Sequence, residues 1–275
     1  MSTAAERTRF TDLLAAEWIK LRSLRSTYWV LGGGALLVIG INANSAWTNA
    51  RRLADMPPPP AGTAPHFGFD PLHTAFVEPA WQLFMVLAAT VGALSVFGEY
   101  TSGLIRTTFT AVPDRRAVIA AKTVVVAAVL CGLGAVVAGV SFGVTQALLR
   151  DEGGLSIGDP GALRAVVASA LLAPVCALVG MALGAVVRHA AGTVVAVVGT
   201  LLLLPALFQG DTYRWVKEIG NAMPLTAWGR LVENPGAAAL PEKYPVTLTE
   251  AWAVFAAWPL VAVVVTVTVV CRRDV

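Results

Sequence analysis

Six long apolar runs dominate the chain, and charged residues gather in the segments between them. The runs cover residues 28–47, 77–97, 123–149, 163–187, 193–208 and 251–271. Each run approaches or exceeds the roughly 20 residues that a helix needs to cross a hydrocarbon core of about 30 Å. The runs lack the alternation of barrel strands, and in lipid only a helix or a closed barrel satisfies its own backbone. The pattern therefore predicts an all-α membrane protein with six transmembrane helices in a single domain, residues 1–275.

The composition agrees with a membrane protein and excludes several kinds of activity. The chain is 56% hydrophobic and 13% charged, with a mean hydropathy of +0.69, whereas soluble domains are about 25% charged. Ion-coupled transporters usually keep an ionisable residue inside a span, and the middles of these runs contain none. The sequence has neither a G-x-x-x-x-G-K-[ST] phosphate loop nor a catalytic or zinc-binding motif. We therefore expect no enzyme activity, cofactor or metal site in this chain.

The distribution of Lys and Arg predicts the orientation, because cytoplasmic loops carry an excess of them. With the N-terminus inside, twelve of the 20 basic residues are cytoplasmic: Arg7, Arg9, Lys20, Arg22, Arg25, Arg106, Arg115, Arg116, Lys122, Arg188, Arg272 and Arg273. Both termini are then cytoplasmic in a multi-pass protein of the cell (plasma) membrane. A basic inner rim facing anionic membrane lipids accounts for the net charge of +3 without a nucleic-acid partner.

Residues 1–26 precede the first run, and most of them follow a helical pattern. Apolar residues share one face: Phe10, Leu13, Leu14, Trp18, Leu21 and Leu24. The opposite face carries polar and small residues: Arg9, Asp12, Ala16, Lys20 and Ser23. This predicts an interfacial amphipathic helix on the inner surface of the membrane. It serves either as a membrane anchor or as a surface on which a cytoplasmic partner rests.

Residues 98–122 join the second and third runs on the cytoplasmic side. The pattern predicts a helix over 99–112 with an apolar face: Tyr100, Leu104, Ile105, Phe109 and Val112. The other face, presented to the cytoplasm, contains Glu99, Ser102, Gly103, Arg106 and Thr110. Pro113 ends this helix, and Asp114 begins the helix that carries Arg115, Arg116 and Lys122 into the third span. The segment is predicted to be a cytoplasmic elbow.

Two stretches of this sequence resemble a known family. FGEYTSGLIRTTFTAVPDRRAVIAAK resembles the Glu-Tyr-x-x-Gly-x-x-Arg stretch, followed by Pro, basic residues and Lys, of membrane subunits of type 2 ABC exporters, particularly compact six-span actinobacterial permeases. LLAAEWIKLRSLRSTYWVLG resembles the entry helix and first span of the same permeases. The resemblance implies a permease subunit that forms the path for export. A separate subunit would hydrolyse the ATP.

The resemblance also implies partners and site residues. In such exporters a coupling helix between spans two and three docks on the cytoplasmic ABC ATPase, which holds the ATP and Mg²⁺. Carried over by position, the coupling residues are Glu99, Tyr100, Gly103, Arg106, Pro113, Arg115 and Arg116, with Glu17, Lys20 and Arg22 on the neighbouring N-terminal helix. The alternative is that Glu99 and Arg106 merely solvate the inner rim. A second permease copy, forming a homodimer, is implied as well.

Polar residues inside the spans are the remaining candidates for contact with a cargo. Asn42, Asn44 and Gln82 lie in the first two spans and are candidates to line a substrate path. The alternative is that they form hydrogen bonds with neighbouring helices. A mostly apolar path is suited to an amphipathic or lipid-like substrate.

Residues 209–250 contain aromatic and charged residues before the last span. Short re-entrant helices on the outer side would place Trp215, Val216 and Ile219 on one face, and an ordinary surface loop is the alternative. For the whole chain, the alternative to a transporter is a non-transporting membrane scaffold, a sensor or an immunity protein. A copurifying ATP-hydrolysing partner would distinguish a transporter from these.

Overall fold

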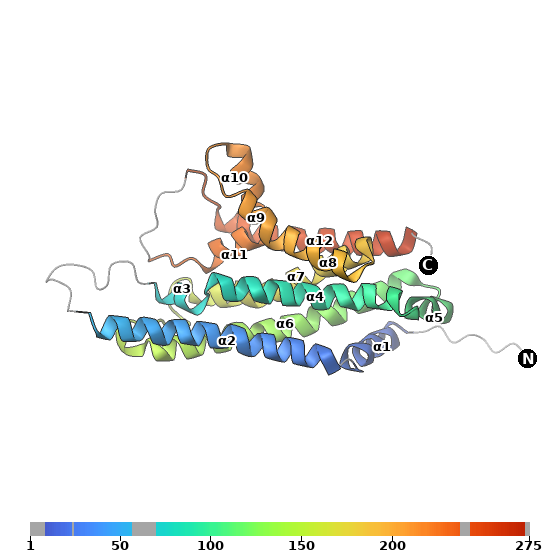
Figure 1. Cartoon of the computed structure of the whole chain (residues 1–275), viewed down its shortest axis with the longest axis horizontal. Helices are drawn as coiled ribbons and strands as arrows, with labels where there is room; N and C mark the ends of the chain where they lie inside the picture. The colour runs from blue at the N-terminus through green and yellow to red at the C-terminus, as the bar shows by residue number, and fades with distance from the viewer. Residues whose placement is uncertain (1–8, 24, 57–69, 237–242, 273–275) are drawn as a thin grey trace, which may run out of the picture.

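A computed structural model describes residues 9–23, 25–56, 70–236 and 243–272 (Figure 1). These residues form helices and connecting turns, with no strand among them. Six helical segments are long and apolar enough to cross a membrane: Thr27–Ala54, Pro71–Thr101, Arg115–Leu148, Ala162–Val187, Ala190–Leu207 and Leu248–Arg272. The predicted all-α fold with six candidate spans is therefore confirmed.

The helices are numbered along the chain as in Figure 1. Their bounds are α1 Phe10–Ser23, α2 Arg25–Ala54, α3 Pro71–Ala75, α4 Glu78–Thr101, α5 Leu104–Ala111, α6 Arg115–Leu148, α7 Ala162–Val187, α8 Ala190–Val198, α9 Leu204–Leu207, α10 Arg214–Asn221, α11 Pro224–Val232 and α12 Leu248–Arg272. A 3₁₀ turn, Arg150–Glu152, follows α6, and a π-helical stretch, Gly199–Leu203, joins α8 to α9.

Several helices extend beyond the apolar runs that predicted them. The first continues to Ala54, seven residues past the predicted end at residue 47. The third begins at Arg115, inside the predicted elbow. The Asp114 side chain caps α6 by accepting a hydrogen bond from the Ala117 N–H at 3.1 Å. A capped helix can carry polar residues before its apolar part, so hydropathy alone underestimates its length.

The centre of the bundle is α7, which packs against α4, α6 and α12. In its most apolar window, 72% of the residues are buried, against 22% for the fifth and the sixth candidate spans. Close packing depends on small residues, because a Cβ built on Gly180 would lie 1.8 Å from the Ala89 oxygen of α4. Similarly, a Cβ on Gly134 of α6 would lie 2.1 Å from the Ala170 oxygen of α7. Glycine is required at both crossings.

The segments predicted to be cytoplasmic gather at one end of the bundle. Helices α1 and α5, the start of α6 and the end of α12 lie towards the right of Figure 1. Helices α3, α10 and α11 lie away from that end. Figure 1 also shows α8 and α9 following one another along the bundle as the fifth candidate span, and α10 projecting from it.

The predicted segment 209–250 contains two short helices. Trp215 on α10 is exposed. Helix α11 is packed into the bundle, where the Trp228 indole donates a hydrogen bond to the Ser169 hydroxyl at 2.9 Å. Its ring also lies 5.8 Å from that of Trp81. These contacts fix α11 against α4 and α7, whereas residues 237–242 lie outside the described part of the chain.

Candidate functional site

Four charged side chains from three helices meet at the end of the bundle that contains α1 and α5. Glu17 and Lys20 come from α1, Glu99 from the last turn of α4, and Lys122 from the second turn of α6. The Lys20 Nζ lies 2.7 Å from Glu17 Oε1 and 2.9 Å from Glu99 Oε1. The Lys122 Nζ also bonds Glu17, and it lies 2.9 Å from Glu99 Oε1. We call these four residues the charge cluster.

The charge cluster is largely removed from solvent. The exposed fractions of its side chains are 4% for Lys122, 6% for Glu17, 11% for Glu99 and 28% for Lys20. Burial by itself would lower the pKa of Lys20, but its hydrogen bonds to Glu17 and Glu99 and their negative charges outweigh burial and raise the pKa above 10.5. A raised lysine pKa means that its contribution to stability is complete below pH 10.5 and is lost only as the pH rises through the raised value. Lys20 therefore keeps its charge throughout the physiological range.

Helical spacing explains how these elements bring the charges together. Glu17 lies one turn after Leu13, which packs against Val118 and Ala121 of α6. That apolar contact holds α1 along the first two turns of α6, so Glu17 is directed at Lys122, one residue after Ala121. Two acids and two lysines alternate in space, so each buried charge has partners of opposite sign.

The predicted placement of Glu99 and Lys20 is corrected by this geometry. Glu99 does not share an exposed helix face with Arg106, because α4 continues to Thr101 and a separate helix, α5, begins at Leu104. The break occurs at Gly103, whose φ of 71° is a left-handed conformation that glycine adopts readily. Lys20, predicted on a polar face of α1 with Asp12, instead turns towards the bundle. Leu24, predicted on the apolar face, lies outside the described residues.

Helix α5 follows the predicted pattern in part. Ile105 is buried and Phe109 is half-buried against the bundle, as expected for an apolar face. Leu104, expected on the same face, is 43% exposed. The Arg115 guanidinium lies 5.1 Å from the centre of the Phe109 ring, a cation–π contact between α6 and α5. The helix ends at Ala111, just before Pro113, as predicted.

Other predicted coupling residues surround α5 on the same end of the molecule. Arg22, Arg106, Pro113 and Arg116 are exposed, and Gly103 is exposed at the break between α4 and α5. The structure thus brings the two predicted motifs together: the α1 motif meets the Glu-Tyr motif through the charge cluster.

Tyr100 is held by an arginine that sequence reasoning did not place at the site. The Arg188 guanidinium stacks 4.2 Å from the centre of the Tyr100 ring, and its Nη2 donates a hydrogen bond to the Tyr100 hydroxyl at 3.2 Å. Arg188 follows the last residue of α7, 88 positions further along the chain. Its position after a long apolar run marked it only as a basic cytoplasmic residue.

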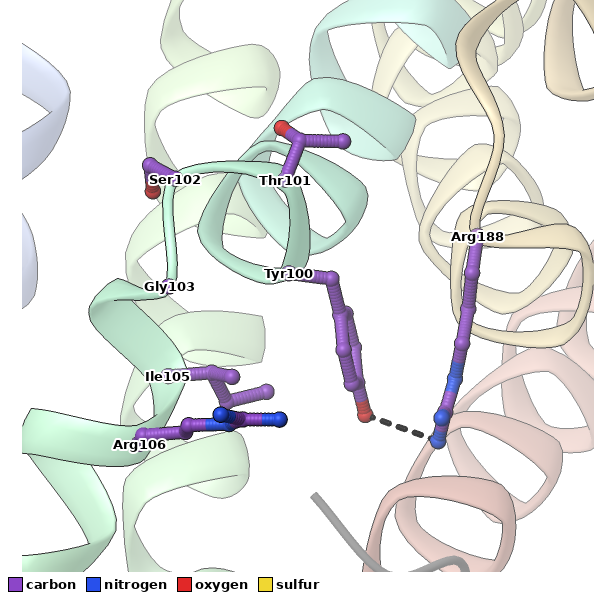
Figure 2. A pocket seen from close by; sticks show the side chains of 7 residues that line it. All are labelled: Tyr100, Thr101, Ser102, Gly103, Ile105, Arg106 and Arg188. Atoms are coloured by element: carbon purple, nitrogen blue, oxygen red, sulfur yellow. Dashed lines mark hydrogen bonds between the residues drawn. The ribbon is translucent and has the colours of Figure 1, made fainter.

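Between α5, the end of α4 and the α7–α8 junction lies a hollow of about 510 Å³. Figure 2 shows the side chains of Arg106, Tyr100 and Arg188 extending into the same region from these three places. Residues 100–103, Ile105, Arg106 and Arg188 line it, and we call it the arginine hollow.

The three candidate path residues have different surroundings. Asn42 is fully buried; it donates a hydrogen bond to the Ser141 hydroxyl at 3.2 Å and accepts one from the Val77 N–H at 3.2 Å. Gln82 donates to the Glu78 carboxylate at 2.7 Å. Asn44 is exposed on α2. Asn42 therefore joins α2 to α6 and to the start of α4, which is the alternative role considered for it.

Comparison with known proteins adds no family to this description. No protein-family model matches the chain, and no curated protein matches it significantly.

Proposed function

We propose that this chain is the permease subunit of an ABC exporter and that α5 is its coupling helix. The observation that carries the proposal is the union of two motifs in one place: α1 and the segment after α4, which both resemble type 2 ABC permeases in sequence, are joined by the charge cluster. The resemblance implied that these two helices are neighbours, and the bond between Lys20 and Glu99, 79 residues apart, agrees with this. Their junction supports a shared role at the surface that would face the ATPase.

The connections of α5 are suited to passing a movement into the membrane. Its N-terminal end is joined to α4 through Ser102 and Gly103, and its C-terminal end is joined to α6 through Pro113 and Asp114. Helices α4 and α6 are in turn held together by the bond between Glu99 and Lys122. A push on α5 would therefore move the cytoplasmic ends of α1, α4 and α6 as one unit.

The rest of the transporter follows from the same proposal. ATP and Mg²⁺ bind to a separate cytoplasmic ABC ATPase, and a second copy of this chain completes the path. The chain lies in the plasma membrane with both ends and α5 in the cytoplasm, in agreement with its excess of Lys and Arg at that end. The apolar spans are suited to export of an amphipathic or lipid-like substrate.

Co-expression with an ABC ATPase encoded beside the gene tests this proposal. We expect a stable complex that hydrolyses ATP, and no hydrolysis by the purified chain alone. Replacing the exposed Thr107 of α5 by Trp should weaken association roughly tenfold, or about 1.4 kcal/mol, because a bulky side chain obstructs docking. Pull-down and ATP hydrolysis measure this.

The matched control is His73→Trp, which adds an indole at the exposed position of helix α3, which is otherwise buried or half-buried, at the other end of the bundle. It should leave the complex intact. If no complex forms, or if Thr107→Trp associates as well as His73→Trp, α5 is not the docking helix, and a scaffold or sensor becomes the better proposal.

A further inference from the structure

Two arginines in the arginine hollow lack the partners that the nearby lysines have. Lys20 and Lys122 are each bonded to two carboxylates. In the part of the chain that the structure describes, no carboxylate forms an ion pair with Arg106 or Arg188. The two guanidinium groups therefore concentrate positive charge on one hollow, beside a cluster whose own charges cancel.

Arg188 is held at the hollow at an energetic cost. Its φ of 55° makes it a left-handed residue that is not glycine, the single such case among the described residues, and a conformation of this kind costs about 1 kcal/mol or more. Its Nε is buried and has no hydrogen-bond acceptor among the described residues. A buried donor without an acceptor costs about 1–3 kcal/mol. Arg188 is therefore kept at the hollow against two energetic costs.

The groups around the hollow select the kind of anion. The hydroxyls of Thr101 and Ser102 already donate hydrogen bonds to the Gly98 carbonyl, at 3.1 and 2.8 Å. The two arginines are therefore the main hydrogen-bond donors that a ligand in the hollow would meet. Guanidinium groups bind phosphate and carboxylate oxygens in pairs. A volume of about 510 Å³ exceeds what one carboxylate occupies. Two arginines facing one space match the charge and the several oxygens of a phosphate group.

The surroundings of the hollow also fit a ligand with an apolar part. Leu104, between the lining residues Gly103 and Ile105, is 43% exposed. Helix α8 begins two residues after Arg188 and exposes Val194 and Val195. Helix α5 follows the second candidate membrane span, and α8 forms the beginning of the fifth. We propose that the arginine hollow binds a phosphate group, supplied by the headgroup of an anionic phospholipid, through Arg106 and Arg188.

Binding of soluble lipids to the purified full chain, without any ATPase, tests this site. The probes are dihexanoyl phosphatidic acid, dihexanoyl phosphatidylcholine and inorganic phosphate, each competing with a fluorescent short-chain phosphatidic acid. We expect phosphatidic acid to compete at least tenfold better than phosphatidylcholine. Competition by inorganic phosphate at the same concentration would assign the site to free phosphate and overturn the lipid source; weak competition by phosphate supports the lipid source.

Paired substitutions connect the binding to these residues. Arg106→Gln with Arg188→Gln should reduce phosphatidic acid binding at least tenfold, whereas Arg52→Gln with Arg150→Gln, which removes the same charge from exposed positions at the other end, should not. Tyr100→Phe keeps all charges and removes the hydroxyl that holds Arg188, so it should weaken binding by a smaller factor. If the double variant does not fold, phosphatidic acid binding by the Tyr100→Phe variant tests the proposal.

Two results would overturn the proposal. One is equal binding of phosphatidic acid by the two double variants. The other is unchanged lipid binding by the Arg106→Gln, Arg188→Gln variant together with lost association with the ATPase, which would assign the hollow to a carboxylate of the partner protein instead.

Discussion

Lys122 illustrates how a single charged residue can be placed inside an apolar helix. Of the six residues that precede it, four are buried or half-buried, and only 4% of its own side chain is exposed. An unpaired ammonium at such a site would carry a large desolvation cost. Glu17 and Glu99 compensate for it from two other helices, so Lys122 makes the fold depend on their correct arrangement.

Replacing Lys122 by Met should destabilise the protein by about 3–5 kcal/mol, because it leaves two buried carboxylates that share Lys20 alone. Thermal unfolding in detergent measures the loss. The matched control, Arg116→Met, changes an exposed arginine of the same helix and should stay within about 0.5 kcal/mol of the parent. Adding Glu17→Gln to Lys122→Met removes one carboxylate and should recover part of the loss. Equal stability of Lys122→Met and Arg116→Met would refute a buried charge cluster.

Residues of the cluster could be identified from the sequence, and the resemblance implied that their helices are neighbours, but the bonds between the side chains could not be predicted. The motifs make Glu99 and Lys20 candidates, with Glu99 on the face presented to the cytoplasm and Lys20 on the polar face of the N-terminal helix. Helical periodicity separates polar from apolar faces, but it does not show which face meets another helix. Here two polar faces meet each other, so the prediction that Glu99 faces the cytoplasm was wrong. The role of Arg188 depends on a contact with Tyr100 across 88 residues, which no local pattern contains.

At the scale of helices, α7 organises the bundle through backbone contacts at small residues. Gly134 of α6 approaches the Ala170 carbonyl, and Pro174, four residues later in α7, has no N–H to bond that carbonyl within the helix. The close glycine therefore lies against a carbonyl that has no helical partner. The six helices were predictable because lipid requires long apolar runs, whereas these crossings depend on which of the 25 glycines meets a neighbour.

Gly134→Ala should destabilise the bundle by roughly 1–3 kcal/mol, because the added methyl group would overlap the Ala170 carbonyl. Gly132→Ala, two residues away in the same helix, meets nothing within 4 Å and should be neutral or stabilising. Thermal unfolding of the two variants compares them directly. A Gly134→Ala protein as stable as Gly132→Ala would mean that α6 and α7 separate more easily than this packing implies.

At the scale of the whole molecule, the elements with coupling motifs share one end, and α3 and α11 lie away from it (Figure 1). Helix α1 and the end of α12 also lie at that end, which agrees with an even number of spans. The distribution of basic residues predicts which end is cytoplasmic. The position of each end relative to a membrane could be predicted only from charge, since helix packing is the same in either orientation.

Cysteine labelling in intact cells tests the orientation. A cysteine at exposed Thr107 should react with a membrane-impermeant reagent only after the cells are opened, whereas one at exposed Gly236 should react from outside. The three native cysteines are first replaced by Ala. Reaction at residue 107 in intact cells, with protection at 236, would invert the predicted orientation.

The residues of the charge cluster become available in a fixed order as the chain is synthesised. Glu17 and Lys20 leave the ribosome first and can pair with each other one turn apart within α1. Glu99 follows, and Lys122 completes the set 105 residues after Glu17. Helix α1 can therefore take its final place only when the beginning of the third span has been made and set beside the second. The final position of α1 thus depends on the correct placement of the second and third candidate spans.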